Sequence, residues 1–247
     1  MRTLHLFRTR FRPNLMGTLL TLVLVTFLMS LGFWQLHRAE EKKELLRLAK
    51  AQTLVPPSPW QVGMALPKLF QGLVLQGHYL SYTLLLDNQY SEAHQWGYHV
   101  LNALLVAKGH VVLVDRGWVL GDLRRSVLPA IEIPSGAVLI QGQAYYPSSK
   151  GLVLGDVIEP HGTNLAVIER VDIKLVSNLL HKKVSPFIIR LDKRAAGGYA
   201  RDWPIVSMPP ERHYAYALQW FAMAFILVLI YLIRSASKLK KPPPNVP

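Results

Sequence analysis

The chain has 247 residues, no cysteine and a formal net charge of +13 at pH 7. The absence of cysteine excludes disulfide bonds, thiolate metal sites and a cysteine nucleophile. Eight of the 28 basic residues lie in two short terminal segments, so the rest of the chain has 20 basic against 15 acidic residues. Basic termini beside anionic lipid headgroups explain this charge, and we expect no nucleic-acid partner.

The first predicted element is a membrane span at residues 15–36, preceded by a basic leader at 1–14. The span has no charged residue and is long enough to cross about 30 Å of hydrocarbon as a helix. A signal peptide has only about 7–15 apolar residues and a small-x-small cleavage site, which is missing here. We therefore expect an uncleaved transmembrane helix.

The second predicted span covers residues 214–233 and is followed by a basic tail at 234–247. Short basic flanks stay in the cytoplasm, so both termini are predicted inside and residues 37–213 in the periplasm. The short leader runs directly into the first span, which argues against a long transit peptide. These features favour a multi-pass protein of a bacterial inner membrane, in contact with membrane lipids.

The region between the spans is predicted to be mainly β. Residues 37–52 are helix formers that extend the first span, and the proline-containing stretch 53–68 is typical of a linker. Residues 69–203 hold short runs rich in Val, Leu and Tyr between turn residues, which predict strands. These runs are Leu69–Tyr79, Thr83–Gln89, Tyr98–Ala107, His110–Val119, Val138–Tyr146, Ala166–Val171 and Phe187–Leu191.

Two local signals complete the predicted fold. Lys108-Gly109 is typical of a hairpin turn, and Asp172 is a suitable N-cap for a helix over Ile173–His181. The predicted fold class is a membrane protein of the α+β type, in which two transmembrane helices flank a mainly antiparallel β periplasmic domain.

The β domain offers no convincing catalytic set. His94 and His99 are expected on opposite faces of a strand, in solvated or hydrogen-bonded roles. Asp115 and Arg116 are adjacent, which favours a structural ion pair over an active site. The sequence has no Gly-x-Ser-x-Gly elbow, phosphate loop or His-Glu-x-x-His motif. We therefore predict that the protein is not an enzyme.

The start of the second span is more informative. Ala217, Trp220 and Ala224 follow His213 at +4, +7 and +11, so all four share one helix face. Small residues allow another helix or a flat ligand to approach closely. A histidine that faces inward at a membrane boundary is a functional candidate by default.

Haem is one molecule that the residues at this end of the second span could bind. A neutral imidazole is a common axial ligand, and Arg38 and Arg212 are placed to face the haem propionates near water. The residues expected at the same depth on the first span are Trp34, Gln35, His37 and Arg38. The alternative is an aromatic belt in which His213 only bonds to lipid headgroups.

Three motifs between the two spans support a family resemblance. Residues 32–38 have the pattern Gly-x-Trp-Gln-x-x-Arg, and residues 114–119 the pattern Val-x-Arg-Gly-Trp-Val, preceded by Gly97-Tyr98. Residues 213–224 have the pattern His-x-x-Tyr-Ala-x-x-Trp-Phe-x-x-Ala. On these motifs, in this order, the chain resembles the surfeit locus protein 1 family, membrane factors that help to assemble haem-copper cytochrome c oxidases.

The resemblance implies a non-catalytic assembly factor that acts when haem a enters the largest oxidase subunit. Its partners would be cytochrome c oxidase subunit 1 and haem-synthesis or other assembly factors. Some bacterial members are thought to bind haem a through the histidine that matches His213, which would be the metal ligand here. The other residues that we expect around the haem are Trp34, Gln35, Arg38, Arg212 and Trp220.

The chain also departs from the family pattern. Glu211-Arg212 replaces a common Asn-Asn pair, Asp115 a common Asn and Leu120 a common Pro, and Val167 or Ile168 lies near the place of a common Trp. Two alternatives stay open. One is a scaffold that holds an oxidase assembly intermediate without a ligand. The other is a membrane-anchored periplasmic enzyme, which requires a concave pocket with convergent polar groups.

Overall fold

The structure is a computed structural model and describes residues 9–11, 13–91, 93–122, 124–148 and 157–238. The chain divides into two compact units. Unit 1 combines Met1–Leu46 with Val206–Pro247, and unit 2 is Arg47–Ile205.

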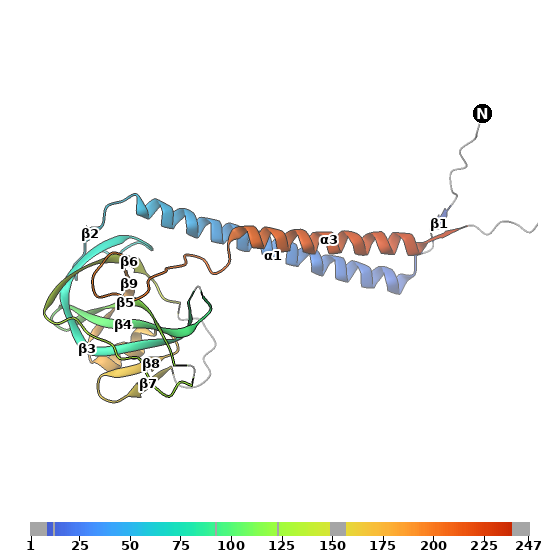
Figure 1. The fold of residues 1–247 in the computed structure, drawn as a ribbon. Coiled ribbons are helices and arrows are strands. Elements are labelled where there is room, and N and C mark those ends of the chain that lie inside the picture. Colours follow the sequence, from blue (N-terminus) through green and yellow to red (C-terminus); the bar gives the residue numbers. More distant parts are fainter. Residues whose placement is uncertain (1–8, 12, 92, 123, 149–156, 239–247) are drawn as a thin grey trace, which may run out of the picture. The chain divides into compact units, whose positions relative to one another are not determined.

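Unit 1 is built on two long helices, α1 (Leu15–Thr53) and α3 (Pro210–Ser235), which lie side by side (Figure 1). Strands β1 (Thr9–Phe11) and β10 (Ala236–Lys238) pair antiparallel before α1 and after α3. α1 runs unbroken from the predicted span into the helix-forming residues that follow it. α3 begins at Pro210, because the fixed φ of proline suits the first turn of a helix.

The two helices pack through small and aromatic residues. A Cβ on Gly32 would overlap the ring of Phe221, so only glycine allows this approach. The rings of Phe33 and Phe221 meet edge to face with centroids 5.4 Å apart. Near the opposite end of the pair, the hydroxyls of Thr18 and Tyr231 are 2.7 Å apart. The helices therefore form an antiparallel pair with specific contacts along its length.

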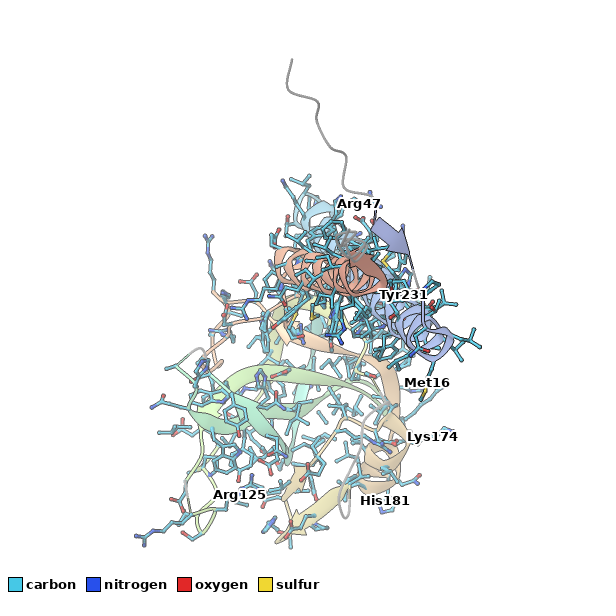
Figure 2. All side chains as sticks on the ribbon, turned by 90° about the vertical axis from the view of Figure 1, so that its right-hand side faces the viewer. Met16, Arg47, Arg125, Lys174, His181 and Tyr231 are labelled. Atoms are coloured by element: carbon cyan, nitrogen blue, oxygen red, sulfur yellow. The ribbon has the colours of Figure 1, made fainter. Side chains whose placement is uncertain are left out.

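Both helices are long and apolar enough to cross a membrane. Their most apolar 18-residue windows are only 6% and 11% buried, whereas the core helix of a soluble protein is mostly buried. Figure 2 shows the layer of side chains around the pair, with Met16 labelled on α1 and Tyr231 on α3. So much exposed apolar surface indicates lipid contact, and the prediction of two spans that flank a β domain is confirmed.

In its described residues, unit 2 contains the last turns of α1, a mixed sheet and the short helix α2. Its elements are β2 (Ser58–Pro59), β3 (Gly72–Tyr90), β4 (Trp96–Ala107), β5 (His110–Leu120), β6 (Ala137–Tyr145), β7 (Ile158–His161), β8 (Leu165–Ile168), α2 (Ile173–Leu180) and β9 (Lys183–Leu191). Neighbouring strands follow the order β4-β5-β9-β6-β3-β8-β7, and β3 also pairs with β4. That second pairing closes β3, β4, β5, β9 and β6 into a small barrel (Figure 1).

Most pairings in this sheet are antiparallel, as predicted, and three are parallel. The parallel pairs are β2–β3, β3–β8 and β5–β9. The predicted hairpin at Lys108-Gly109 joins β4 to β5, and Gly109 has a φ of +77°. Asp172 caps α2 as predicted, since its side chain accepts hydrogen bonds from the backbone N–H groups of Lys174 and Leu175.

The structure corrects two predictions about strands. Leu69–Tyr79 and Thr83–Gln89, predicted as separate strands, form the single strand β3. The register shifts between Tyr79 and Thr83, where the strand leaves β6 and begins to pair with β8. A bulge, not a turn, therefore interrupts the pattern. The predicted linker 53–68 contains the short strand β2, and β7 was not predicted.

The core of unit 2 lies on both faces of the central strands. Along β5, Val112 and Val114 belong to one buried cluster, and Val111 and Leu113 belong to another. The first cluster takes residues from all five strands of the ring, so it fills the barrel interior. The second includes Val176 of α2, which covers the outside of the barrel. Burial on both faces explains why β5 is an unbroken apolar run.

Candidate functional site

The candidate site in unit 1 lies where the first turn of α3 packs on α1. His213, Ala217 and Ala224 are buried on one face of α3, as their spacing predicted. Ala39 of α1 is also fully buried, and Gly32 packs against α3. Small side chains on both helices thus allow the backbones to approach each other at this level.

His213 makes one hydrogen bond and leaves one ring nitrogen without a partner. Its Nδ1 lies 2.7 Å from Oε1 of Gln35. Because an amide oxygen can only accept, Nδ1 carries a proton, and in the neutral imidazole Nε2 then has the free lone pair. Nε2 is buried and has no hydrogen-bond partner. Leaving such an atom unpaired costs about 1–3 kcal/mol, so this nitrogen calls for a functional explanation.

The other predicted site residues are less closely associated with His213. Trp34 is 53% exposed, and Trp220 is only partly buried. Arg212 is exposed in the first turn of α3. Of the predicted set, only Gln35 makes a hydrogen bond to His213 among the described residues.

Arg38, which was predicted to face the haem propionates, pairs with a carboxylate of its own helix. It donates a hydrogen bond of 2.6 Å to Glu41 one turn later, and Nε2 of His37 lies 3.2 Å from the same carboxylate. These contacts follow from the i,i+3 and i,i+4 spacing along α1, which we could have read from the sequence. The Tyr214 hydroxyl donates a hydrogen bond to Glu40 that joins the two helices. No spacing in the sequence predicts this bond, because the two residues lie on different helices.

In unit 2, the stretch Val114–Val119 has a structural role. Arg116 is 3% exposed and donates hydrogen bonds to Oδ1 of Asn102 at 2.9 Å, the carbonyl of Glu132 at 2.8 Å and the carbonyl of Gly197 at 2.7 Å. The bonds to Glu132 and Gly197 hold the segment between β5 and β6 and the segment after β9 against the barrel. The next residue, Gly117, has a φ of +115°.

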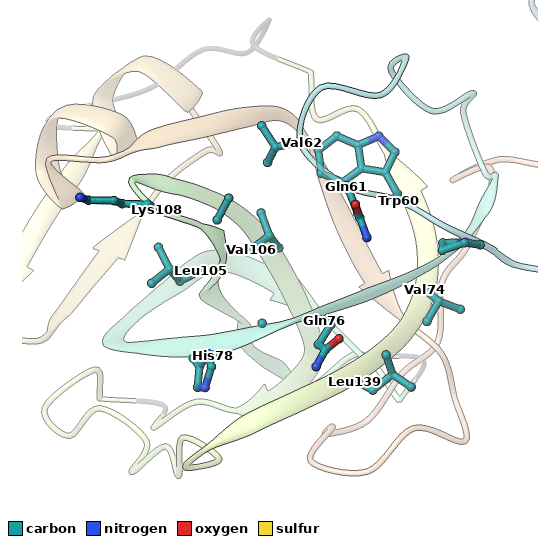
Figure 3. Close-up of a pocket in the computed structure, with 13 residues that line it drawn as sticks. Trp60, Gln61, Val62, Val74, Gln76, His78, Leu105, Val106, Lys108 and Leu139 are labelled. Atoms are coloured by element: carbon teal, nitrogen blue, oxygen red, sulfur yellow. The ribbon is translucent and has the colours of Figure 1, made fainter.

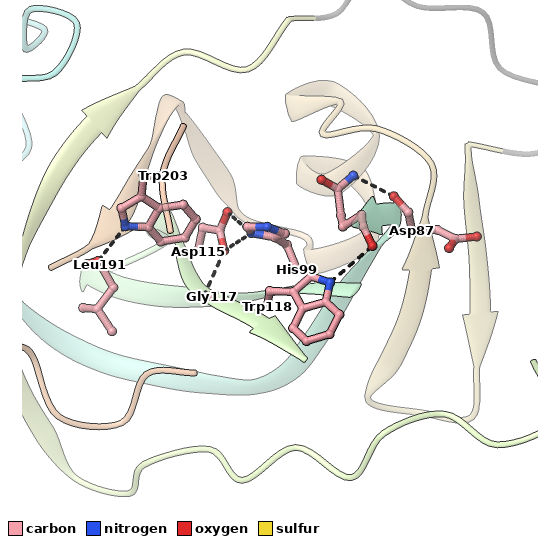
Figure 4. A network of polar contacts seen from close by, with 8 residues as sticks. Asp87, His99, Asp115, Gly117, Trp118, Leu191 and Trp203 are labelled. Atoms are coloured by element: carbon pink, nitrogen blue, oxygen red, sulfur yellow. Dashed lines mark hydrogen bonds and ion pairs between the residues drawn. The ribbon is translucent and has the colours of Figure 1, made fainter. Parts of the chain in front are cut away.

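The predicted ion pair between Asp115 and Arg116 is wrong. Both oxygens of Asp115 lie 3.0–3.1 Å from Nδ1 of His99, on the neighbouring strand (Figure 4). Consecutive residues of a strand point to opposite faces, which separates the two side chains. His94 lies in the turn before β4, whereas His99 lies within β4 and has the hydrogen-bonded role predicted for it.

A cavity of about 630 Å³ lies beside β2, β3 and the β4–β5 hairpin (Figure 3). Its lining combines apolar side chains with the amides of Gln61 and Gln76. His78 and Lys108 are the titratable residues in this lining, and no carboxylate accompanies them. The cavity therefore lacks the paired groups that acid–base chemistry requires.

The sequence of this chain matches a known protein family. The pattern described as the SURF1 family matches residues 22–225, which include both helices and the β domain between them. The chain belongs to the SURF1 family. SURF1 proteins are known in oxidase assembly and form a family of assembly factors, not of enzymes.

Two similar SURF1 relatives come from Rickettsia. The SURF1-like protein of Rickettsia prowazekii (strain Madrid E) is 25% identical over 235 residues, which cover 90% of this chain and 91% of that protein. The SURF1-like protein of Rickettsia felis (strain ATCC VR-1525 / URRWXCal2) is 24% identical over 222 residues, or 87% of this chain and 95% of that protein. The similarity thus extends over nearly the whole chain.

Proposed function

We propose that this SURF1 protein helps to deliver haem a to subunit 1 of a haem-copper cytochrome c oxidase, with His213 as the axial ligand of the haem iron. Family membership supports the role in oxidase assembly. The unpartnered Nε2 of His213 is the observation that carries the ligand assignment. Haem a is cargo in this proposal, and the protein performs no chemistry on it.

The hydrogen bond to Gln35 suits a ligating histidine. Histidines that bind metals usually donate their other ring N–H to an oxygen, which fixes the tautomer and makes the ligating nitrogen more basic. The Nδ1 of His213 donates in this way to Oε1 of Gln35. No group of three or more His, Asp or Glu side chains in the described ranges is placed to hold a metal ion. Haem needs no such group, since the porphyrin supplies four of the iron ligands.

The burial of Nε2 sets a condition on binding. The nitrogen is closed to solvent, so iron can reach it only if side chains around the first turn of α3 move. A carrier must release its haem again, and a site that opens and closes serves that purpose. Trp220 and Trp34 would then form apolar walls, and the exposed Arg212 would face the propionates. Arg38 would pair with a propionate only by giving up its ion pair with Glu41.

The basic flanks of the two spans support the orientation that we propose. Short cytoplasmic segments are rich in Lys and Arg, which would place both termini in the cytoplasm of a bacterium and the β domain in the periplasm. Subunit 1 and haem-synthesis or other assembly factors would be the partners in the inner membrane.

An absorption spectrum tests the ligand. The full chain is purified in detergent from cells that synthesise haem a, as wild type, as His213→Ala and as the control His37→Ala, whose side chain is 74% exposed. We expect a haem a band in the wild type and in His37→Ala that is lost in His213→Ala. A band that survives in His213→Ala refutes the ligand assignment.

The same variants separate the carrier from a ligand-free scaffold. If neither wild type nor variants show a band while His213→Ala still supports normal oxidase assembly, the scaffold function holds. Loss of both the band and oxidase assembly in His213→Ala alone supports the carrier.

A further inference from the structure

Strand β6 of unit 2 has an open edge along the first half of its length. On one side of the strand, residues 137–143 all pair with β3. On the other side, β9 pairs only with residues 142–145. One further bond, from the N–H of Asp192 to the carbonyl of Gln141 at 2.9 Å, ends this second ladder. In the part of the chain that the structure describes, residues 137–140 therefore have no strand on this side.

The backbone groups of Ala137 and Leu139 point toward the open side. In an antiparallel ladder, the N–H and C=O of one residue point to the same side, and this side alternates from residue to residue. The carbonyl of Gln141 points away from β3, since it accepts from Asp192. Leu139 and Ala137 lie two and four residues earlier in an unshifted register, so their N–H and C=O groups point the same way. They find no hydrogen-bond partner in another described segment.

The open stretch of β6 has none of the features that usually protect a sheet edge. Natural sheets protect their free edges with charged side chains, with proline or with bulges. Residues 137–141 have the sequence Ala-Val-Leu-Ile-Gln, without charge or proline, and their register with β3 is continuous. Ala137 is exposed, and Leu139 is 73% exposed. The edge is therefore accessible to another strand.

A groove of about 680 Å³ lies along this edge. Val138, Leu139 and Ile140 contribute to its lining from β6, and Pro134 and residues 195–197 contribute from the connecting segments. Figure 3 shows the side chain of Leu139 on β6. Among the described residues, no charged side chain lines this groove. An apolar groove beside free backbone groups suits an extended chain whose side chains alternate between two faces.

The length of the open edge favours a short segment of another protein over a second copy of this chain. Residues 137–141 span about 17 Å, at about 3.4 Å per residue. Two copies joined edge to edge through this stretch would share only a few residues each, whereas a stable interface buries about 1,200–2,000 Å² and takes about 20–30 residues from each partner. A short extended segment needs no such area, because it can bond to all the free groups and fill the groove.

We propose that the open edge of β6 binds an extended segment of another protein, which adds a strand to the sheet. The main chain of this segment bonds to the N–H and C=O groups of Ala137 and Leu139. Its uncharged, apolar side chains at alternate positions lie in the groove. The site is contained in unit 2 and is independent of the haem a site proposed for unit 1.

Fluorescence anisotropy of a labelled peptide, Ser-Thr-Val-Thr-Val-Thr-Ser, with the detergent-purified full chain tests this proposal. We expect saturable binding. Two N-methylated forms serve as probes, one methylated at the two valines and one at the two threonines that precede them, because these patterns block opposite edges of an extended peptide. One form should bind at least about tenfold more weakly and the other within about threefold of the parent peptide, since an added strand bonds to β6 through one edge only.

Three variants locate the site. Leu139→Pro removes an N–H that bonds to no strand, so the ladder to β3 stays intact, but peptide affinity should fall at least about tenfold. Leu139→Thr keeps the N–H and a good strand former, and it should bind the peptide within about threefold of the wild type. His213→Ala should bind as the wild type does, which separates this site from the haem a site. The methylated peptides keep the proposal testable if Leu139→Pro does not fold.

Several results would overturn the proposal. These are the absence of saturable peptide binding to the wild type, equal effects of the two methylation patterns, and unchanged affinity in folded Leu139→Pro. A wild-type dimer that Leu139→Pro dissociates, measured by analytical ultracentrifugation, would also overturn it, because a second copy of the chain would then occupy the edge.

Discussion

Replacement of Arg116 by methionine is expected to destabilise unit 2 strongly. The change removes the three hydrogen bonds of 2.7–2.9 Å that the guanidinium donates to Asn102, Glu132 and Gly197. It also removes the contact of the guanidinium with the ring of Tyr199, whose centroid is 5.0 Å away. Hydrogen bonds to a charged group are worth about 1.5–3 kcal/mol each, and loss of the buried charge itself offsets part of this. The expected net loss is about 3–5 kcal/mol.

Hydrogen exchange of the β5 amides measures this loss in the full chain in detergent. If these amides exchange through global opening of unit 2, the destabilisation should accelerate their exchange about 150- to 4,000-fold. Arg124→Met is the control, because Arg124 is exposed and such surface changes stay within about 0.5 kcal/mol. Equal exchange in the two variants would mean that Arg116 does not fasten the connecting segments to the barrel, and the reasoning would be wrong.

Three further predictions concern single contacts. Gln35→Leu removes the acceptor for His213 and should weaken haem a binding by about tenfold in a spectral titration, whereas Gln35→Glu keeps an acceptor and should bind normally. Gly32→Val places side-chain atoms in the ring of Phe221 and should separate the helices, as measured by the distance between spin labels on cysteines introduced into this cysteine-free chain. Gly117→Ala should cost about 1–3 kcal/mol in the exchange assay, because φ is +115° and the new Cβ would lie 2.6 Å from a backbone carbonyl oxygen.

Local signals predicted most elements of the fold. The apolar spans, the alternating strands and the Asp172 cap all depend on residues close together in sequence, where propensity and spacing act directly. The merging of two predicted strands into β3 was missed, because a bulge and a turn interrupt an alternating pattern in the same way. Closure of the barrel depends on pairing between distant strands, which no local pattern specifies.

In the candidate sites, too, local spacing was predicted and contacts between distant segments were not. The buried face of α3 was predicted from helical spacing. Gln35 was expected at the depth of His213, but the hydrogen bond between the two side chains was not predicted. The bond between His99 and Asp115 was not predicted, since it depends on the register of β4 against β5. The position of Arg190 beside the rings of Tyr145 and Trp203 was not predicted either, because these rings come from β6 and the segment after β9 and no local pattern brings them together.

The polar contacts between α1 and α3 have a consequence for how the pair can move. Thr18 and Tyr231 join the helices at one end, and Gln35 and His213 join them at the other. The two bonds are separated by 17 residues on α1 and 18 on α3, or about 26 Å along each helix. Breaking the bond to His213 together with the neighbouring bond from Tyr214 to Glu40 would let this end of the pair open. The distant hydroxyl pair would keep the other end joined and restore the alignment of the helices on closing.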